Sequence, residues 1–167
     1  MAALPADLLT VALGINIVNA DLMRRRALRS AVHGFVDALR DAHPETPIGL
    51  LTPTWCAIHE KTPGPGAFDP KALARGEVRF IATGDPAAVA GGALTLEVVR
   101  SELAEIIEER ADDRLGLIDG LALYGEADAE AHPLPDGLHP DEETHALIAE
   151  RFVRSAGLSA LLPRMGG

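Results

Sequence analysis

Short apolar runs alternate along the chain with longer segments in which apolar residues recur at helical spacing. Residues 8–13, 48–52 and 115–119 have the length and near-continuous apolar character of strands buried on both faces of a parallel sheet. Helical spacing extends from residue 22 to about 42 and from 95 to about 111. The pattern therefore predicts strands separated by amphipathic helices.

The ends of these segments support the same assignment. Asn19 or Asp21 could cap the helix at 22–42, and Pro140 with three acidic residues suits the start of a last helix at 141–155. Such alternation predicts an α/β three-layer architecture with a parallel sheet, in which ligands bind at the carboxyl ends of the strands. We therefore expect the site in the loops after residue 14, at 53–60 and at 119–140.

Residues 61–93 interrupt the alternation. They begin with a proline- and glycine-rich stretch and end at Gly91 and Gly92, and residues 77–82 could form a short strand or a hairpin arm. An excursion of this length in a compact domain is typical of a binding loop or lid.

Composition limits the classes of partner. With 167 residues and 47% hydrophobic content, residues 1–167 are expected to form a single domain with a real core. The formal charge of −10 argues against nucleic acid and membrane partners, which are bound through Lys and Arg. The lone Cys56 cannot form an internal disulfide, and neither a signal peptide nor a membrane span is recognisable. We expect a cytoplasmic protein.

Two short motifs could carry chemistry. Asp136 and His139 stand three residues apart before a predicted helix, where a carboxylate could orient an imidazole that acts as general base. Gly14 and Asn16 follow the first strand, where an asparagine amide could stabilise an oxyanion. Taken singly, each motif is also explained by a turn and a helix cap.

Together the two motifs, Gly-Ile-Asn at 14–16 and Asp-Gly-Leu-His at 136–139, resemble the SGNH (GDSL-type) hydrolases from Asp7 to about Arg154. The resemblance implies a flavodoxin-like three-layer sandwich that lacks its N-terminal strands, and hydrolysis of a small-molecule ester. It makes His139 the general base, Asp136 its partner and Asn16 an oxyanion donor, with Gly14 setting the turn.

Residues 13–19 and 53–60 resemble, less specifically, a bacterial esterase subgroup of that family. The second stretch makes Trp55, Cys56 and His59 candidate pocket residues, although an exposed loop position is the commoner explanation for His59.

The chain departs from the family pattern at two places. Ile17 stands where many members have aspartate, and the nucleophile motif Gly-Asp-Ser is absent. The four serines, Ser30, Ser101, Ser155 and Ser159, fall on predicted helices or the C-terminal tail, outside any nucleophile-elbow context. The enzyme hypothesis therefore requires a serine from an N-terminal segment or a partner chain.

Other nucleophiles and cofactors have little support. Cys56 could pair with a histidine, but a lone cysteine more often acts as a small buried hydrophobe. His132, His139 and His145 do not have a recognised zinc spacing, and no glycine-rich phosphate loop is present. We expect neither a metal nor a cofactor.

Three hypotheses remain open at this point: an ester hydrolase completed from elsewhere, a catalytically silent chain that binds a ligand or partner, and a truncated gene product. In the family, the strand that carries the nucleophile lies beside the one that corresponds to 8–13. We therefore expect this strand to pair with a second copy of the chain or with an N-terminal segment.

Overall fold

Three short parallel strands form the centre of the protein. The computed structural model describes residues 4–162, so both ends of the expected 1–167 unit lie outside the described residues. The strands are β1 (Leu9–Ala12), β2 (Ile48–Leu51) and β5 (Leu115–Ile118), in the order β1-β2-β5. They are the three predicted strands, each shortened by one residue at one or both ends.

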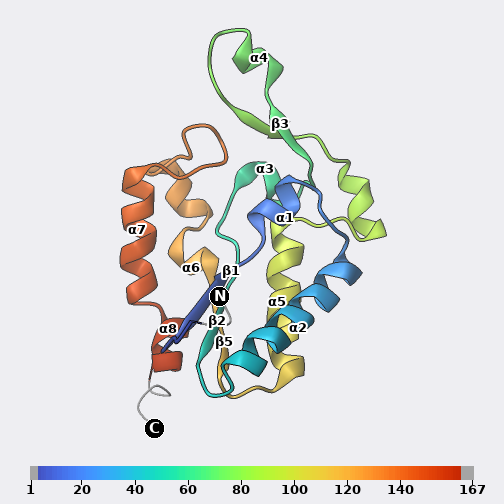
Figure 1. Ribbon diagram of the computed structural model, residues 1–167. Coiled ribbons are helices and arrows are strands. Elements are labelled where there is room, and N and C mark those ends of the chain that lie inside the picture. Colours follow the sequence, from blue (N-terminus) through green and yellow to red (C-terminus); the bar gives the residue numbers. More distant parts are fainter. Residues whose placement is uncertain (1–3, 163–167) are drawn as a thin grey trace.

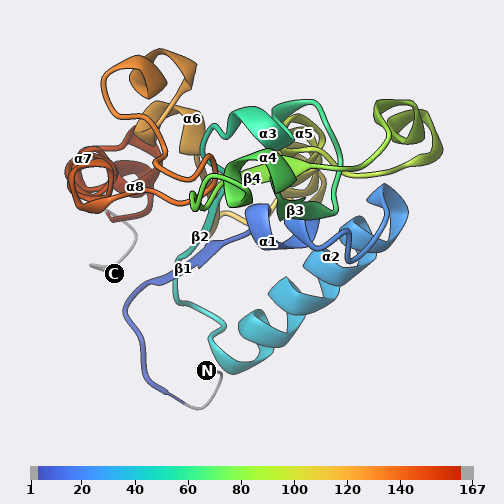
Figure 2. The same ribbon diagram turned by 90° about the horizontal axis from the view of Figure 1, so that it is seen from above.

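Helices cover both faces of this sheet. The long helices α2 (Arg25–Ala42) and α5 (Leu96–Arg110) lie on one side. On the other side lie α6 (Gly120–Leu123), α7 (Glu142–Val153) and α8 (Ala156–Leu161), as Figures 1 and 2 show. The predicted α/β architecture with three layers is therefore confirmed.

Each face of the sheet has its own core. The larger core packs the apolar stripes of α2 and α5 against β2. In the smaller core, Leu161 of α8 contacts the sheet at Gly49 and Gly116, which are partners in register. A Cβ atom at Gly49 would lie 3.0 Å from Leu161 Cδ1, so the glycines allow α8 to approach this closely.

Strand β1 differs from the prediction of burial on both faces. Thr10 and Ala12 are exposed, while Leu9 and Val11 are half-buried. The reason is that β1 is the edge strand of the described sheet and that α8 packs mainly against β5 and β2. One edge and part of one face of β1 are therefore open.

The start of α2 also differs from expectation. Arg24 occupies the N-cap position, and its side chain pairs with Asp21 instead of making a capping hydrogen bond. Asn19 is the last residue of the short helix α1 (Ile15–Asn19). Because the chain turns between α1 and α2, both expected capping residues lie too far upstream. The last predicted helix, at 141–155, matches α7, and the separate helix α8, which Ser155 caps, follows beyond the predicted range.

The region 61–93 folds largely as a hairpin. After α3 (Ala57–Glu60), β3 (Gly66–Phe68) pairs antiparallel with β4 (Phe80–Ala82), and α4 (Pro70–Leu73) lies between them. We call residues 66–82 the arm, which projects beyond the carboxyl ends of the parallel strands in Figure 1. Of residues 77–82, which the sequence assigns to a short strand or a hairpin arm, residues 80–82 form strand β4 of this hairpin.

Two further short elements, both 3₁₀ helices, lie outside the sandwich layers: η1 (Pro86–Gly91) follows the arm, and η2 (Glu126–Glu130) follows α6. Among residues 4–162, none of the helices combines the length and apolar character needed to cross a membrane.

A buried carboxylate joins α2 to α5. Glu102 of α5 is fully buried and accepts hydrogen bonds from Arg25 and Arg29 of α2, the latter at 2.8 Å. Glu105 of the same helix also binds Arg29, at 3.0 Å, but its side chain is 45% exposed. The two glutamates thus share a partner and differ in burial.

This difference predicts the effect of removing each carboxylate. Glu102→Ala should lower the free energy of unfolding by about 2–4 kcal/mol, because it leaves a cavity and removes the buried carboxylate that both arginines bind. Glu105→Ala should cost less than about 1 kcal/mol, as exposed ion pairs do. Urea denaturation measures both, and equal losses would contradict the assignment of Glu102 as the buried link.

Candidate active site

Three segments meet at the carboxyl ends of the parallel strands: α1, the loop after β2, and the loop before α7. Between them lies a cavity of about 190 Å³. Its lining includes Asn16 of α1, Trp55 and Cys56 after β2, and Leu138 and His139 before α7. The two motifs singled out in the sequence therefore border one cavity.

Asp136 and His139 make the contact that their spacing predicts. The Asp136 Oδ2 atom lies 2.7 Å from His139 Nδ1. The other carboxylate oxygen, Oδ1, accepts hydrogen bonds from the backbone N–H groups of Leu138 at 2.9 Å and of His139 at 2.7 Å. The carboxylate is therefore held by its own loop while it holds the imidazole.

These contacts determine the ionisation of Asp136. Partial burial alone would raise its pKa, but the hydrogen bonds from the His139 backbone and imidazole and from the Leu138 backbone outweigh burial and lower it. The carboxylate is thus ionised at neutral pH. An ionised acceptor beside Nδ1 favours the tautomer protonated at Nδ1 and leaves Nε2 as the basic atom.

The imidazole is accessible to a reactant. The His139 side chain is 65% exposed, and its Nε2 atom has no hydrogen-bond partner among residues 4–162. Asp136 is less open, at 23%. A base of this kind needs an oriented ring and a free nitrogen, and this pair provides both.

Gly14 places Asn16 at the end of β1. Gly14 has a φ of 138° and precedes α1, a conformation that L side chains rarely adopt. A Cβ atom there would lie only 2.6 Å from Pro53 Cγ. The glycine therefore permits both the turn and the close approach of the loop after β2.

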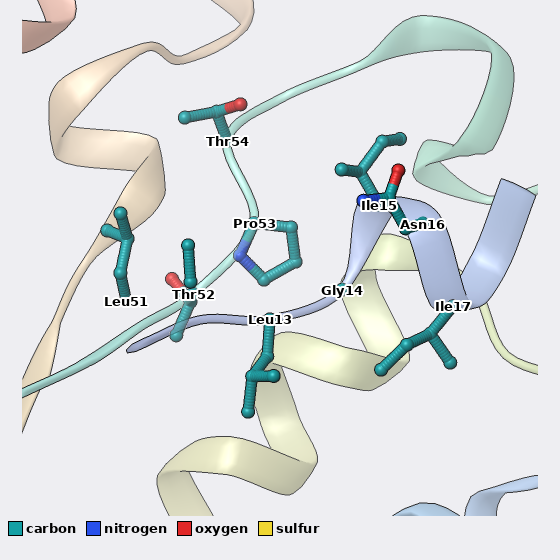
Figure 3. A pocket seen from close by; sticks show the side chains of 10 residues that line it. Leu13, Gly14, Ile15, Asn16, Ile17, Leu51, Thr52, Pro53 and Thr54 are labelled. Atoms are coloured by element: carbon teal, nitrogen blue, oxygen red, sulfur yellow. The ribbon is translucent and has the colours of Figure 1, made fainter. Parts of the chain in front are cut away.

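Asn16 also borders a second cavity, of about 380 Å³, at the ends of β1 and β2. Figure 3 shows this cavity between the segment from Leu13 to Ile17 and the segment from Leu51 to Thr54. The exposed Asn16 thus borders both cavities, the one at the ends of β1 and β2 and the one that His139 also lines.

Cys56 lines the smaller cavity, but its thiol has the properties of an unreactive side chain. Its side chain is buried, and the thiol donates to the Gly137 carbonyl oxygen at 3.5 Å. Burial, the largest influence, raises the pKa of the thiol to about 11, so almost none is thiolate at neutral pH. These features match the small buried hydrophobe expected of most lone cysteines, not a nucleophile.

His59 does not line either cavity next to Asn16, and the expectation of an exposed loop position is also wrong. It is fully buried, with Nε2 3.0 Å from Asn19 Oδ1 and Nδ1 3.3 Å from the Thr62 carbonyl oxygen. Burial lowers its pKa, so the ring is neutral and joins α1 to α3. The adjacent Glu60 pairs with Arg100 of α5. Helices α1 and α5 and strand β4 pack against α3, which buries His59 instead of exposing it.

Several residues of the site were missed in the sequence. Asn19, Thr54 and Leu134 complete parts of the smaller cavity. Phe80 of the arm packs its ring near-perpendicular to the His139 ring, with centroids 5.4 Å apart. Only Asn19 had a local signal, a second asparagine in the segment that carries Asn16; the others depend on tertiary contacts.

None of the four serines lines either cavity: Ser30 lies in α2, Ser101 in α5, and Ser155 and Ser159 at the cap of α8 and within it. Within the described part of the chain, no group of three His, Cys, Asp or Glu side chains is placed to hold a metal ion.

No protein-family model matches the chain, and no curated protein sequence is detectably similar to it. Solved structures are similar. The salicylyl-acyltransferase SsfX3 from a tetracycline biosynthetic pathway aligns with a TM-score of 0.68 and 21% identity over 97% of this chain. A carbohydrate esterase family 3 protein from Talaromyces cellulolyticus aligns with a TM-score of 0.56 and 14% identity over 95%.

The chain spans 40% of the length of the acyltransferase and 58% of the esterase. At these identities the likeness establishes the fold alone. The fold is α/β with a parallel sheet, consistent with the flavodoxin-like arrangement of SGNH hydrolases, and it is shared with an acyltransferase and an esterase.

The conformation of Gly14 predicts a specific cost for a side chain. Gly14→Ala should lower the free energy of unfolding by about 1–3 kcal/mol, because the residue would be strained and would clash with Pro53. Gly34→Ala in α2 is the control, since a Cβ there meets nothing within 4 Å. It should be neutral or stabilise by up to about 1 kcal/mol. Thermal denaturation of both variants distinguishes them, and a harmless Gly14→Ala would contradict this account of the turn.

Proposed function

We propose that this chain provides the general base and an oxyanion donor of an SGNH-type serine ester hydrolase. The observation that carries the proposal is the Asp136–His139 pair, whose Nδ1 contact of 2.7 Å leaves Nε2 free beside the cavity that Asn16 also lines. The acyltransferase and esterase folds named above support acyl transfer as the reaction class.

The mechanism follows from the roles that these groups can fill. A serine hydroxyl attacks the ester carbonyl carbon while His139 Nε2 takes its proton, and Asp136 stabilises the imidazolium that forms. The Asn16 amide N–H donates to the oxyanion. As the tetrahedral intermediate collapses, His139 returns the proton to the leaving alcohol. Water then hydrolyses the acyl-serine by the same sequence of proton transfers.

The serine is proposed to come from polypeptide that pairs with β1. Two observations support this position. The first is that β1 is the edge strand of the described sheet, with Thr10 and Ala12 exposed. The second is that Asn16 borders the cavity of about 380 Å³ at the end of this strand, so a residue placed there would lie beside the oxyanion donor. An N-terminal segment or a second chain could supply this strand.

The test is to restore the missing group. A segment that carries a strand followed by Gly-Asp-Ser is joined ahead of residue 1, and hydrolysis of p-nitrophenyl acetate is measured. Activity should appear in the joined protein and be negligible in the chain alone. His139→Ala in the joined protein should reduce kcat by at least about 10³-fold, because members of such a triad act as a unit.

His145→Ala is the matched control, since His145 is an exposed histidine on α7 that lines neither cavity. This variant should retain the activity of the joined protein. Circular dichroism checks that both variants stay folded. Unimpaired turnover in His139→Ala, or rapid labelling of the isolated chain's serines by a fluorophosphonate, would contradict the proposal.

A further inference from the structure

The arm carries an unusual share of the exposed apolar surface. Nine large hydrophobic residues are exposed among residues 4–162, and three of them, Phe68, Leu73 and Val78, lie within the 17 residues of the arm. Phe68 is 52% exposed and Val78 58%. Single exposed apolar residues are ordinary, but their concentration on one projecting element indicates a binding surface.

This surface is continuous with the general base. Phe68 and Phe80 are partners in the hairpin register, and their ring centroids lie 4.8 Å apart. The Phe80 ring in turn lies against the His139 ring, with a centroid distance of 5.4 Å and an angle of 78°. A row of three rings therefore leads from the exposed tip of β3 to the imidazole.

The arm is also fixed to the loop of the base through the backbone. The Phe80 N–H donates to the Asp136 carbonyl oxygen at 2.8 Å. Leu138, two residues further along this loop, is buried and forms an apolar wall of the cavity of about 190 Å³. The row of rings thus has a defined position relative to the reacting atoms.

We infer that the arm binds the apolar portion of the leaving alcohol of the ester substrate. This inference rests on the proposed function. The general base must deliver its proton to the leaving oxygen, so the alcohol lies on the His139 side of the scissile bond. Phe68 and Phe80 extend from that side, and their side chains offer no hydrogen-bonding group. The substrate class is therefore an ester of an alcohol with an extended alkyl or aryl group.

Binding alone can test the arm without any nucleophile. The probes are ethanol, 1-butanol and 1-hexanol, titrated into the full chain labelled with ¹⁵N and followed by NMR. The shifts should map to the amides of Phe68, Phe80 and His139. The dissociation constant should fall about fourfold for each added methylene, as expected when a CH₂ group leaves water.

Two variants locate the site. Phe68→Ser should abolish the dependence of affinity on chain length, because it removes the more exposed of the two phenylalanine rings of the row. Val153→Ser on α7, which alters a residue that is 69% exposed and lines neither cavity, should retain it. Equal behaviour of the two variants, or shifts that map outside the arm, would overturn the inference. Chemical shifts that change with protein concentration instead of alcohol concentration would also overturn the inference, because they would show that the arm contacts a second copy of the chain.

The joined protein separates this inference from the proposed function. Acetate esters of the same alcohols should be hydrolysed with a kcat/KM that rises with alcohol length, and Phe68→Ser should flatten the rise. Hydrolysis with no length dependence would overturn the role of the arm alone. Length-dependent binding without any hydrolysis would overturn the proposed function and leave the apolar binding surface standing.

Discussion

The hydrogen bonds that the Asp136 carboxylate accepts from its own loop are the interaction on which the site depends. Both backbone bonds, from Leu138 and His139, go to Oδ1, which leaves Oδ2 for the imidazole. They also lower the pKa of the carboxyl against the opposing effect of burial. The charge of the carboxylate and the orientation of the imidazole therefore originate in four consecutive residues, 136–139, and the remaining structure has to bring this loop to Asn16.

The parallel sheet accomplishes that placement. Strands β1 and β2 run in the same direction, so the segments that follow them leave the sheet at the same end, where the carboxyl ends of the strands lie. Asn16 and Trp55 lie in these segments, and the loop before α7 lies over the same end of the sheet. The arm departs after α3 and returns so that Phe80 contacts His139. One end of the sheet thus brings together the Asn16 amide, the His139 imidazole and the apolar surface of the arm.

The sequence predicted the parts of the structure that depend on local pattern. The strands, the long helices and the contact between Asp136 and His139 follow from periodicity and from a spacing of three residues. The burial of β1, the position of His59 and the contact of Phe80 with the base could not be predicted, because they depend on which segments pack together. No property of residues 57–60 by themselves indicates that His59 is covered by Asn19 and the Thr62 carbonyl.

The central claim is that Asp136 sets the tautomer of a base whose Nε2 is free. Long-range ¹H–¹⁵N NMR of the His139 ring at pH 8 measures this directly. The account predicts a proton on Nδ1 and an unprotonated Nε2, with a shift toward the Nε2–H tautomer in Asp136→Asn. A ring protonated at Nε2 in the unaltered chain, or one indifferent to Asp136→Asn, would contradict it.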